Sequence, residues 1–340
     1  AQFVQNPWYP VAEPSDAQAS ADMADASRDL TAKLVKLVQA MQEIKAEEDS
    51  RVNSYEIFVN QKQTHIRNSR GVDVTFSGFD CEIEVVTNSR KDDHEIEIYK
   101  DLRFSDKSAE KIIAEVRGMF HTGRQRLNAV PTRQNEHADV LLSGDAVGSF
   151  FQYFAMHTNA SYQYMGVAKA KIGEAITGAD ADPLNIRLVP TLDGSAKNAP
   201  YDETGMPVAE RVLFENGICR SYWGSLQHAH YIGMKNTTSM NNMVVEGGSK
   251  TLDELRSMPH IEITDFSAFD MDAVSGTCGG EIRLAYESDG TISHPTTSGS
   301  LSARYDDVLK NLTFSKETQQ INNRVVPCAV LLRDVTVAGE

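Results

Sequence analysis

The chain has 340 residues, with 33 basic and 48 acidic side chains, and its formal net charge is −15. Hydrophobic residues make up 41% and charged residues 24%, close to the average of globular proteins, so a packed core can form. The acidic excess argues against a protein that follows nucleic-acid phosphates or docks on anionic lipid, because both would require a basic surface. The longest apolar runs fall far short of the roughly 20 residues of a membrane-spanning helix. We therefore expect neither nucleic acid nor a membrane as a direct partner.

The cysteines are widely separated and form no CxxC or Cys/His pattern: Cys81, Cys219, Cys278 and Cys328. In a chain of this length, such usage predicts reduced and mostly buried thiols in a reducing compartment. We therefore expect a cytoplasmic location. The first residue is Ala1 and not Met, so we also expect a processed or trimmed N-terminus.

The first 28 residues are rich in Pro, Ala and Asp, and Pro7, Pro10 and Pro14 interrupt any helix. This composition predicts an extended or linker segment over 1–28. From Asp29 apolar residues recur every three or four positions, which predicts an amphipathic helix over 29–46. Its apolar positions are Leu30, Leu34, Leu37, Val38, Met41 and Ile44.

Apolar and polar residues then alternate in several short segments, around 55–59, 72–76, 83–85 and 96–98. A turn sequence at 68–71 separates the first two, so this region is expected to be an antiparallel meander. Ser105 is expected to cap a second helix that extends to about Phe120.

The remaining elements alternate irregularly between strands and helices, without the regular order of βαβ units. Asn216-Gly217 is the strongest hairpin signal, because both residues tolerate the positive φ of a type I′ turn. The fold class is therefore predicted to be α+β with mainly antiparallel sheets and a few amphipathic helices. The predicted elements are a strand at 138–142, a helix from Asp145 to about 158, a strand at 186–192, hairpins at 212–222 and 281–294, a helix capped by Ser300 that extends to Leu312, and a strand at 328–337.

Several small groups of residues are candidates for chemistry, each with an ordinary structural interpretation. His228 and His230 could share a strand face and bind a metal, but would point apart on a helix. Surface histidines are the favoured interpretation. The acidic residues Asp270, Asp272, Asp202 and Glu203 are better explained as turn caps. Gly247–Lys250 resembles half of a phosphate loop, but Thr251 after it is better explained as the start of a capped helix.

The helix predicted at 145–158 is the most informative element. It carries Gln152, Tyr153 and His157 after an aromatic run. A single histidine on such a helix is more often a hydrogen-bonded core residue than a metal ligand.

Five segments in the same order resemble the TldD/PmbA family, which is known as modulators of DNA gyrase and as metallopeptidase subunits. The acidic turn and hairpin at 201–217 and the block at 275–300 are the longest of them. The others are the turn at 68–71, the segments at 221–222 and 229–233, and the ending at 334–339. The resemblance implies a PmbA/TldD-like C-terminal β-rich domain at 136–340. It also implies that 29–135 is the remainder of an N-terminal or middle α+β region, with the family's usual front domain absent or trimmed.

The TldD type of this family carries HExxxH on a helix, where two histidines bind zinc and the glutamate activates water. The resemblance places Gln152 at the first histidine, Tyr153 at the glutamate and His157 at the second histidine. A neutral glutamine binds zinc poorly, and Tyr153 cannot act as a carboxylate base. We therefore assign no catalytic or metal-binding residue to this chain, and treat these three positions as a candidate peptide groove.

A cysteine completes the zinc site in the TldD type, and this chain again departs from the pattern. Cys328 lies too close to the C-terminal strand, and Gln319 and Gln320 occupy the region where a ligand is expected. The resemblance thus implies a PmbA (TldE)-type subunit, with no cofactor of its own and with zinc in the partner.

The function implied is that of the non-zinc-binding subunit of a heteromeric metallopeptidase that acts on unfolded peptides or peptide precursors. Its expected partners are a TldD-like HExxxH-bearing subunit and the peptide, gripped by strand addition at exposed sheet edges. One alternative is a self-contained metal-dependent peptidase that uses His157 with His228 or His230. Another is a non-catalytic peptide-binding protein that associates with itself as a dimer.

Overall fold

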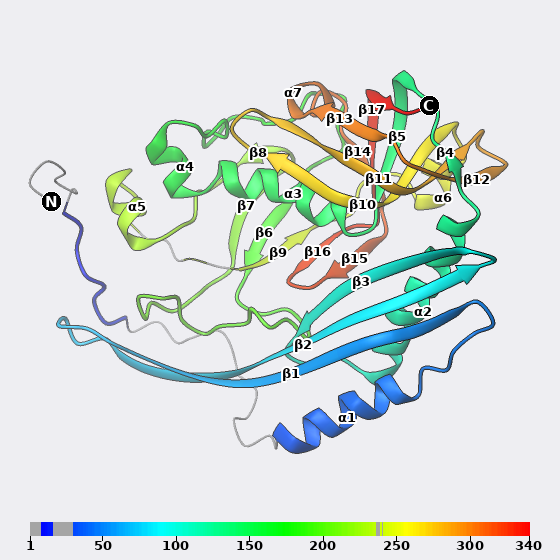
Figure 1. Ribbon diagram of the computed structural model, residues 1–340. Helices are drawn as coiled ribbons and strands as arrows, with labels where there is room; N and C mark the ends of the chain where they lie inside the picture. The colour runs from blue at the N-terminus through cyan, green and yellow to red at the C-terminus, as the bar shows by residue number, and fades with distance from the viewer. Residues whose placement is uncertain (1–7, 16–29, 236–238, 240) are drawn as a thin grey trace, which may run out of the picture.

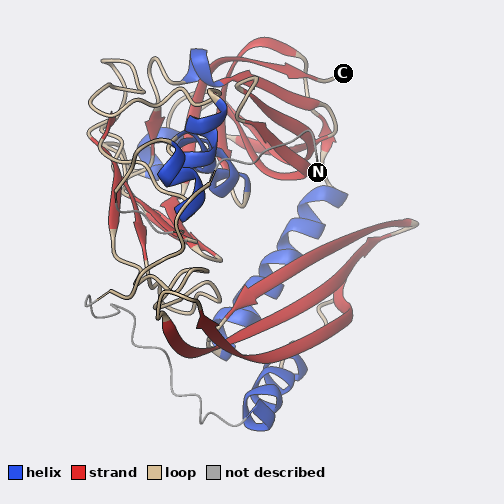
Figure 2. Cartoon of the chain, turned by 90° about the vertical axis from the view of Figure 1, so that its left-hand side faces the viewer, coloured by secondary structure: helices blue, strands red, loops and turns tan. Residues whose placement is uncertain are grey.

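The computed structural model describes residues 8–15, 30–235, 239 and 241–340. The expected linker at 1–28 lies outside these residues, except for 8–15, which contains neither helix nor strand. The described chain forms a three-stranded sheet covered by helices and a larger body built on two further sheets (Figures 1 and 2). Pairing is mainly antiparallel, and the predicted α+β class is confirmed.

The first unit is the predicted meander. Alternate residues of its central strand, Cys81, Ile83 and Val85, are buried against two helices, so one face of this sheet forms a small core. The turn at 68–71 joins the first two strands, as expected. The elements are α1 (Leu30–Gln42), β1 (Ser50–Arg67), β2 (Asp73–Lys91), β3 (His94–Phe104) and α2 (Ala109–Leu127), and the sheet order is β1-β2-β3.

Helix α2 begins later than predicted. Its N-cap is Ser108, whose side-chain oxygen accepts a hydrogen bond from the Lys111 backbone N–H. The prediction of Ser105 as the cap was therefore wrong. The backbone N–H of Ser105 instead donates to the carbonyl of Gly194, 2.7 Å away, which ties this segment to a loop of the larger body.

The first sheet of the larger body closes on itself. β10 pairs in parallel with β5 and also antiparallel with β11, so the path β10-β5-β17-β13-β11 forms a ring. β12 and β4 extend it, and β14 pairs with β17. The bounds are β4 (Val130–Pro131), β5 (Asn135–Ser143), β10 (His260–Asp272), β11 (Thr277–Ser288), β12 (Ser293–Thr297), β13 (Ser300–Arg304), β14 (Thr313–Phe314) and β17 (Ala329–Ala338).

The second sheet of the body has the order β15-β16-β9-β6-β7-β8. Its strands are β6 (Ile186–Val189), β7 (Arg211–Glu215), β8 (Ile218–Cys219), β9 (Asn242–Val245), β15 (Thr318–Ile321) and β16 (Arg324–Pro327). Helix α3 (Ala146–His157) contacts β10 of one sheet and β16 of the other, and its Phe150, Phe151 and Phe154 are fully buried in the shared core. The short helices are α4 (Ala160–Met165), α5 (Leu226–Tyr231), α6 (Leu252–Arg256) and α7 (Tyr305–Val308).

Both predicted hairpins are present. Asn216 and Gly217 have φ of 51° and 76°, as the type I′ turn requires, and β11 pairs antiparallel with β12 around Asp289-Gly290. The helix predicted from Ser300 to Leu312 was wrong. Ser300–Arg304 is a strand with Leu301 and Ala303 turned inward, and only Tyr305–Val308 is helical. The apolar residues of this segment are spaced like those of a helix because a strand, in which every second residue is buried, is followed directly by a single helical turn.

None of the helices in the described ranges combines the length and the apolar character needed to cross a membrane.

Candidate functional site

The structure places Tyr153 and His157, two of the three candidate groove residues, inside the core. Both have an exposed fraction of 0%. The Tyr153 ring stacks on Tyr305 with 3.7 Å between centroids, and its centroid lies 4.2 Å from that of His157. A peptide lying on the surface would therefore not reach either ring in this conformation.

His157 has the role of a hydrogen-bonded core residue, as its position suggested. Its Nδ1 accepts a hydrogen bond from the Lys169 backbone N–H at 3.0 Å. Burial lowers the pKa of His157 to about 4, so the ring is neutral at pH 7. Because Nδ1 accepts, the ring proton resides on Nε2.

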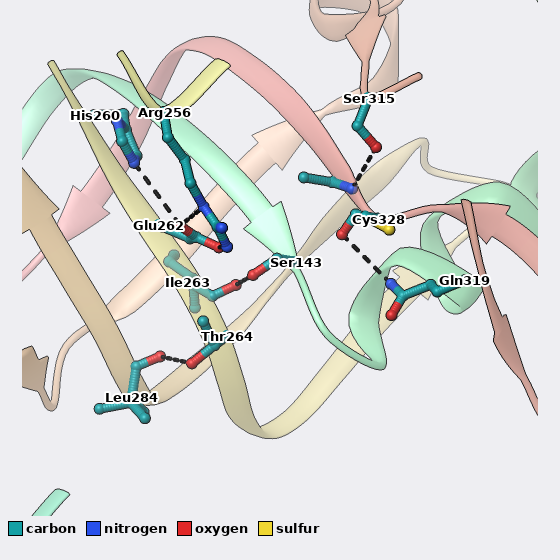
Figure 3. Close-up of polar contacts among 11 residues, drawn as sticks. Ser143, Arg256, His260, Glu262, Ile263, Thr264, Leu284, Ser315, Gln319 and Cys328 are labelled. Atoms are coloured by element: carbon teal, nitrogen blue, oxygen red, sulfur yellow. Dashed lines mark hydrogen bonds and ion pairs between the residues drawn. The ribbon is translucent and has the colours of Figure 1, made fainter. Parts of the chain in front are cut away.

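Gln152 is only partly buried, and it faces the second sheet. Its Oε1 accepts from an Arg324 Nη2 donor at 2.8 Å, and burial lowers the pKa of that guanidinium. The two glutamines near the position expected for a third zinc ligand donate hydrogen bonds to backbone carbonyls. Gln319 donates to the carbonyl of Cys328 at 3.4 Å (Figure 3), and Gln320 donates to that of Asp193 at 2.8 Å.

The other histidines considered for a metal site lie on a helix. His228 and His230 are both in α5, where a two-residue spacing points them apart. His228 Nδ1 lies 3.0 Å from the Ser225 hydroxyl, and His230 packs edge-on against Trp8. Among the described residues, no three His, Cys, Asp or Glu side chains are grouped as metal ligands.

Of the remaining sequence candidates, Asp270 lies within β10 opposite Gly279, so its prediction as a turn cap was wrong. Asp202 and Asp272 accept hydrogen bonds from backbone N–H groups of their own turns, as expected for turn caps. Thr251 forms a capping box with Glu254 at the start of α6. Gly248 packs so closely on Phe314 that a Cβ would lie 2.2 Å from its carbonyl oxygen. The glycines of this loop therefore permit chain packing, which removes the reason for comparing it with a phosphate loop.

The sequence did not reveal a groove that lies between the two units of the chain. We call it the α2–β10 groove, and it consists of two clefts that share Thr122 and Thr264. The inner cleft has a volume of about 590 Å³ and the outer one about 770 Å³. The inner cleft is lined by the middle of β3, by α2 from Glu115, by the start of α3 and by β10 up to Phe269. The outer one is lined by the end of α2, by α6 and by β10 and β11.

Two ion pairs, Lys100–Asp145 and Arg126–Asp265, join one unit to the other beside the inner cleft. Lys100 Nζ on β3 lies 3.6 Å from Glu115 and 3.8 Å from Asp145, the residue before α3. Arg126 of α2 lies 3.9 Å from Asp265 of β10. Burial raises the pKa of the Asp265 carboxyl and lowers that of the Arg126 guanidinium, so this pair is partly desolvated.

A charged cluster of Arg256, His260 and Glu262 lines the outer cleft, and Figure 3 shows the contacts among these side chains. Arg256 grips Glu262 with two parallel hydrogen bonds, Nε to Oε2 at 2.8 Å and Nη2 to Oε1 at 2.7 Å. His260 Nε2 lies 4.0 Å from Glu262 Oε2, and the side chains of His260 and Glu262 are only 4% and 8% exposed. The sequence gives no signal for this group, because Arg256, His260 and Glu262 match no known binding or catalytic motif.

Comparison with known proteins identifies the class to which this fold belongs. The family model of the PmbA/TldA metallopeptidase C-terminal domain matches residues 135–339. The chain therefore belongs to the TldD/PmbA family, and the resemblance of its sequence segments is confirmed. No curated protein matches the chain.

Solved structures with the same fold include proteins of this family. TldE from Thermococcus kodakarensis has a TM-score of 0.78 and 18% identity, covering 98% of this chain and 80% of that one. A putative modulator of a DNA gyrase from Thermotoga maritima has a TM-score of 0.77 and 18% identity, covering 99% and 81%. A putative modulator of DNA gyrase from Bacteroides thetaiotaomicron has a TM-score of 0.73 and 14% identity, covering 100% and 80%.

Proposed function

We propose that this chain is the non-zinc-binding subunit of a TldD/TldE-type heteromeric metallopeptidase that acts on unfolded peptides or peptide precursors. In this proposal the zinc ion and the water-activating glutamate belong to a TldD-like HExxxH-bearing partner. The chain itself completes the substrate-binding site.

The proposal rests on the contacts of Gln152, Tyr153 and His157, the three residues at the positions of the family's metal helix. Each of them is already used in another interaction. Tyr153 is stacked in the core, and the Nδ1 lone pair of His157 is used by the Lys169 N–H. Gln152 is a neutral amide that accepts a hydrogen bond from Arg324. A zinc ion needs several free lone pairs directed at one point, and this set does not offer them.

The free edge of β3 supports the second part of the proposal, which is peptide binding. In the described sheet β3 pairs only with β2, and Lys91 pairs with His94 across a two-residue turn. In such a hairpin the closing pair is hydrogen-bonded, and every second residue then turns its backbone groups outward. By this alternation the N–H and C=O of Tyr99 face the free edge, and Tyr99 lines the inner cleft. An extended peptide could add to this edge by main-chain hydrogen bonds.

The test is reconstitution with a TldD-like subunit encoded beside this chain. We expect peptidase activity and one zinc per heteromer only when both subunits are present. Zinc at one per chain, together with peptidase activity in the isolated protein, would contradict the proposal. Peptide binding by a complex of this chain with itself, with no effect of the second subunit on hydrolysis, would favour the homodimeric binding protein.

A pair of variants tests the role of the β3 edge. Tyr99→Pro removes the outward N–H but leaves the β2–β3 ladder intact, because that N–H is not used within the sheet. Tyr99→Ala removes the same side chain and keeps the N–H. We expect Tyr99→Pro to weaken peptide binding about tenfold relative to Tyr99→Ala, the equivalent of about 1.4 kcal/mol.

A further inference from the structure

The outer cleft of the α2–β10 groove contains a buried histidine whose second nitrogen is available to a ligand. His260 Nδ1 lies 2.6 Å from the carbonyl oxygen of Met258. Because a carbonyl only accepts, Nδ1 carries the ring proton and Nε2 presents a lone pair while the ring is neutral. Among the described residues no hydrogen bond to Nε2 is formed, and the side chain is only 4% exposed. Nε2 faces the Glu262 carboxylate at 4.0 Å, beyond hydrogen-bond distance, and His260 lies in the wall of the cleft.

The second acceptor is Glu262, which faces the same space. Arg256 binds both carboxylate oxygens, but each oxygen has a further lone pair. His260 Nε2 and Glu262 Oε2 are 4.0 Å apart. One nitrogen atom placed roughly 2.9 Å from each can donate to both, with an angle near 90° between the two bonds. Two acceptors held at this separation therefore suit a group with at least two N–H donors on one atom.

The charge of the cleft favours a cationic donor. Its lining contains two carboxylates, Glu262 and Asp253, and one guanidinium, Arg256; His121, His260 and Tyr286 are its other ionisable groups. With the histidines and the tyrosine counted as uncharged, the formal charge of the lining is −1. Arg256 is held in place by its two bonds to Glu262, so it fixes the carboxylate and offers less to an incoming anion.

The length of the α2–β10 groove indicates what kind of ligand fits beside this site. Along α2, Glu115 to Gln125 spans about 15 Å, and along β10, His260 to Phe269 spans about 30 Å. An extended peptide of about five to nine residues fits those lengths, at roughly 3.3 Å per residue. Such a peptide, paired with β3 in the inner cleft, would reach the His260–Glu262 pair in the outer one.

We propose that the His260–Glu262 pair binds a primary ammonium group of the peptide, supplied either by its free amino terminus or by a lysine side chain. This inference rests on the proposed function, because it assigns part of the substrate specificity to the same groove. Arg256 acts as a positioning residue that orients the Glu262 carboxylate.

Four C-terminally amidated peptides of about eight residues distinguish the two sources of the ammonium group. The first has a free amino terminus and no lysine, and the second is the same peptide acetylated at the amino terminus. The third is acetylated and contains one lysine, and the fourth is acetylated and contains acetyl-lysine. Binding to the full chain is measured by fluorescence anisotropy. We expect at least one ammonium-bearing peptide to bind about tenfold more tightly than its acetylated counterpart.

The variant His260→Gln should remove most of this difference, and its thermal unfolding reports whether it remains folded. Glu262→Gln provides a second variant that removes the carboxylate charge at nearly constant shape. The matched control is His65→Gln, because His65 pairs with Asp73 at 2.7 Å on an exposed part of β1, outside the groove.

The outcomes separate this inference from the proposed function. Equal binding of all four peptides, unchanged in His260→Gln and Glu262→Gln, would overturn the ammonium site and leave peptide binding intact. Failure of every peptide to bind would overturn both. A preference that survives in both variants would place the ammonium group elsewhere and would also overturn the inference.

Discussion

The phenol rings of Tyr153 and Tyr305 lie parallel in the core, with 3.7 Å between their centroids and 5° between their planes. Their hydroxyls differ. Tyr305 Oη donates to the backbone carbonyl of Phe150 at 2.8 Å. Tyr153 Oη is buried and has no hydrogen-bond partner among the described residues. The pair thus joins α3 to α7 by ring contact and one hydrogen bond.

This difference predicts opposite effects of removing the two hydroxyls. Tyr305→Phe should lower the free energy of unfolding by about 1 kcal/mol, because a buried hydrogen bond is lost. Tyr153→Phe should leave it unchanged or raise it, because an unpaired buried hydroxyl disappears and the stack remains. Urea denaturation of both variants measures the difference. A larger loss in Tyr153→Phe than in Tyr305→Phe would show that the hydroxyl of Tyr153 has a partner after all.

His157 predicts how stability depends on pH. Its pKa in the folded chain is about 4, below the value of about 6.5 for an exposed histidine, because burial disfavours the charged ring. Between these values the unfolded chain binds more protons than the folded one. The part of the free energy of unfolding that depends on a neutral His157 is therefore fully present above pH 6.5. It is lost as the pH falls toward 4, by up to about 3 kcal/mol.

The measurement is the free energy of unfolding at several pH values from 7 to 4, compared with that of His157→Gln. The glutamine amide oxygen can still accept from the Lys169 N–H, but it does not titrate in this range. We expect the variant to lose less stability over the window than the original chain. Parallel pH profiles would show that the folded state protonates His157 freely.

The cysteines predict a distinct labelling pattern. Burial raises the pKa of Cys81 and Cys219 to about 11 and that of Cys278 to about 12, whereas Cys328 is only partly buried. The thiolate is the reactive form, so a disulfide reagent at pH 8 should modify Cys328 first in the native protein. All four should react after unfolding in denaturant. Rapid modification of Cys278 in the native state, located by mass spectrometry, would mean that the core opens locally.

Local sequence patterns were sufficient for most of the individual elements. The alternation at 83–85 buried one face of β2, and Asn216-Gly217 formed its type I′ turn, because both depend on neighbours in the chain. The family resemblance was also legible in the sequence, since its turns and hairpins are local. The errors fell where two periods adjoin, as at Ser300–Val308, or where a distant contact displaces a cap, as at Ser105.

The sequence by itself determined the α+β class, the acidic surface, the wide spacing of the four cysteines and the family of this protein. Only the tertiary structure decided which polar residues are available for function. It placed Tyr153 and His157 in the core and brought α2 and β10 together into a groove. It also placed Arg256, His260 and Glu262 in the wall of that groove. The physical reason is that burial depends on packing between segments that are distant in the sequence, such as α2 and β10, which no local pattern encodes.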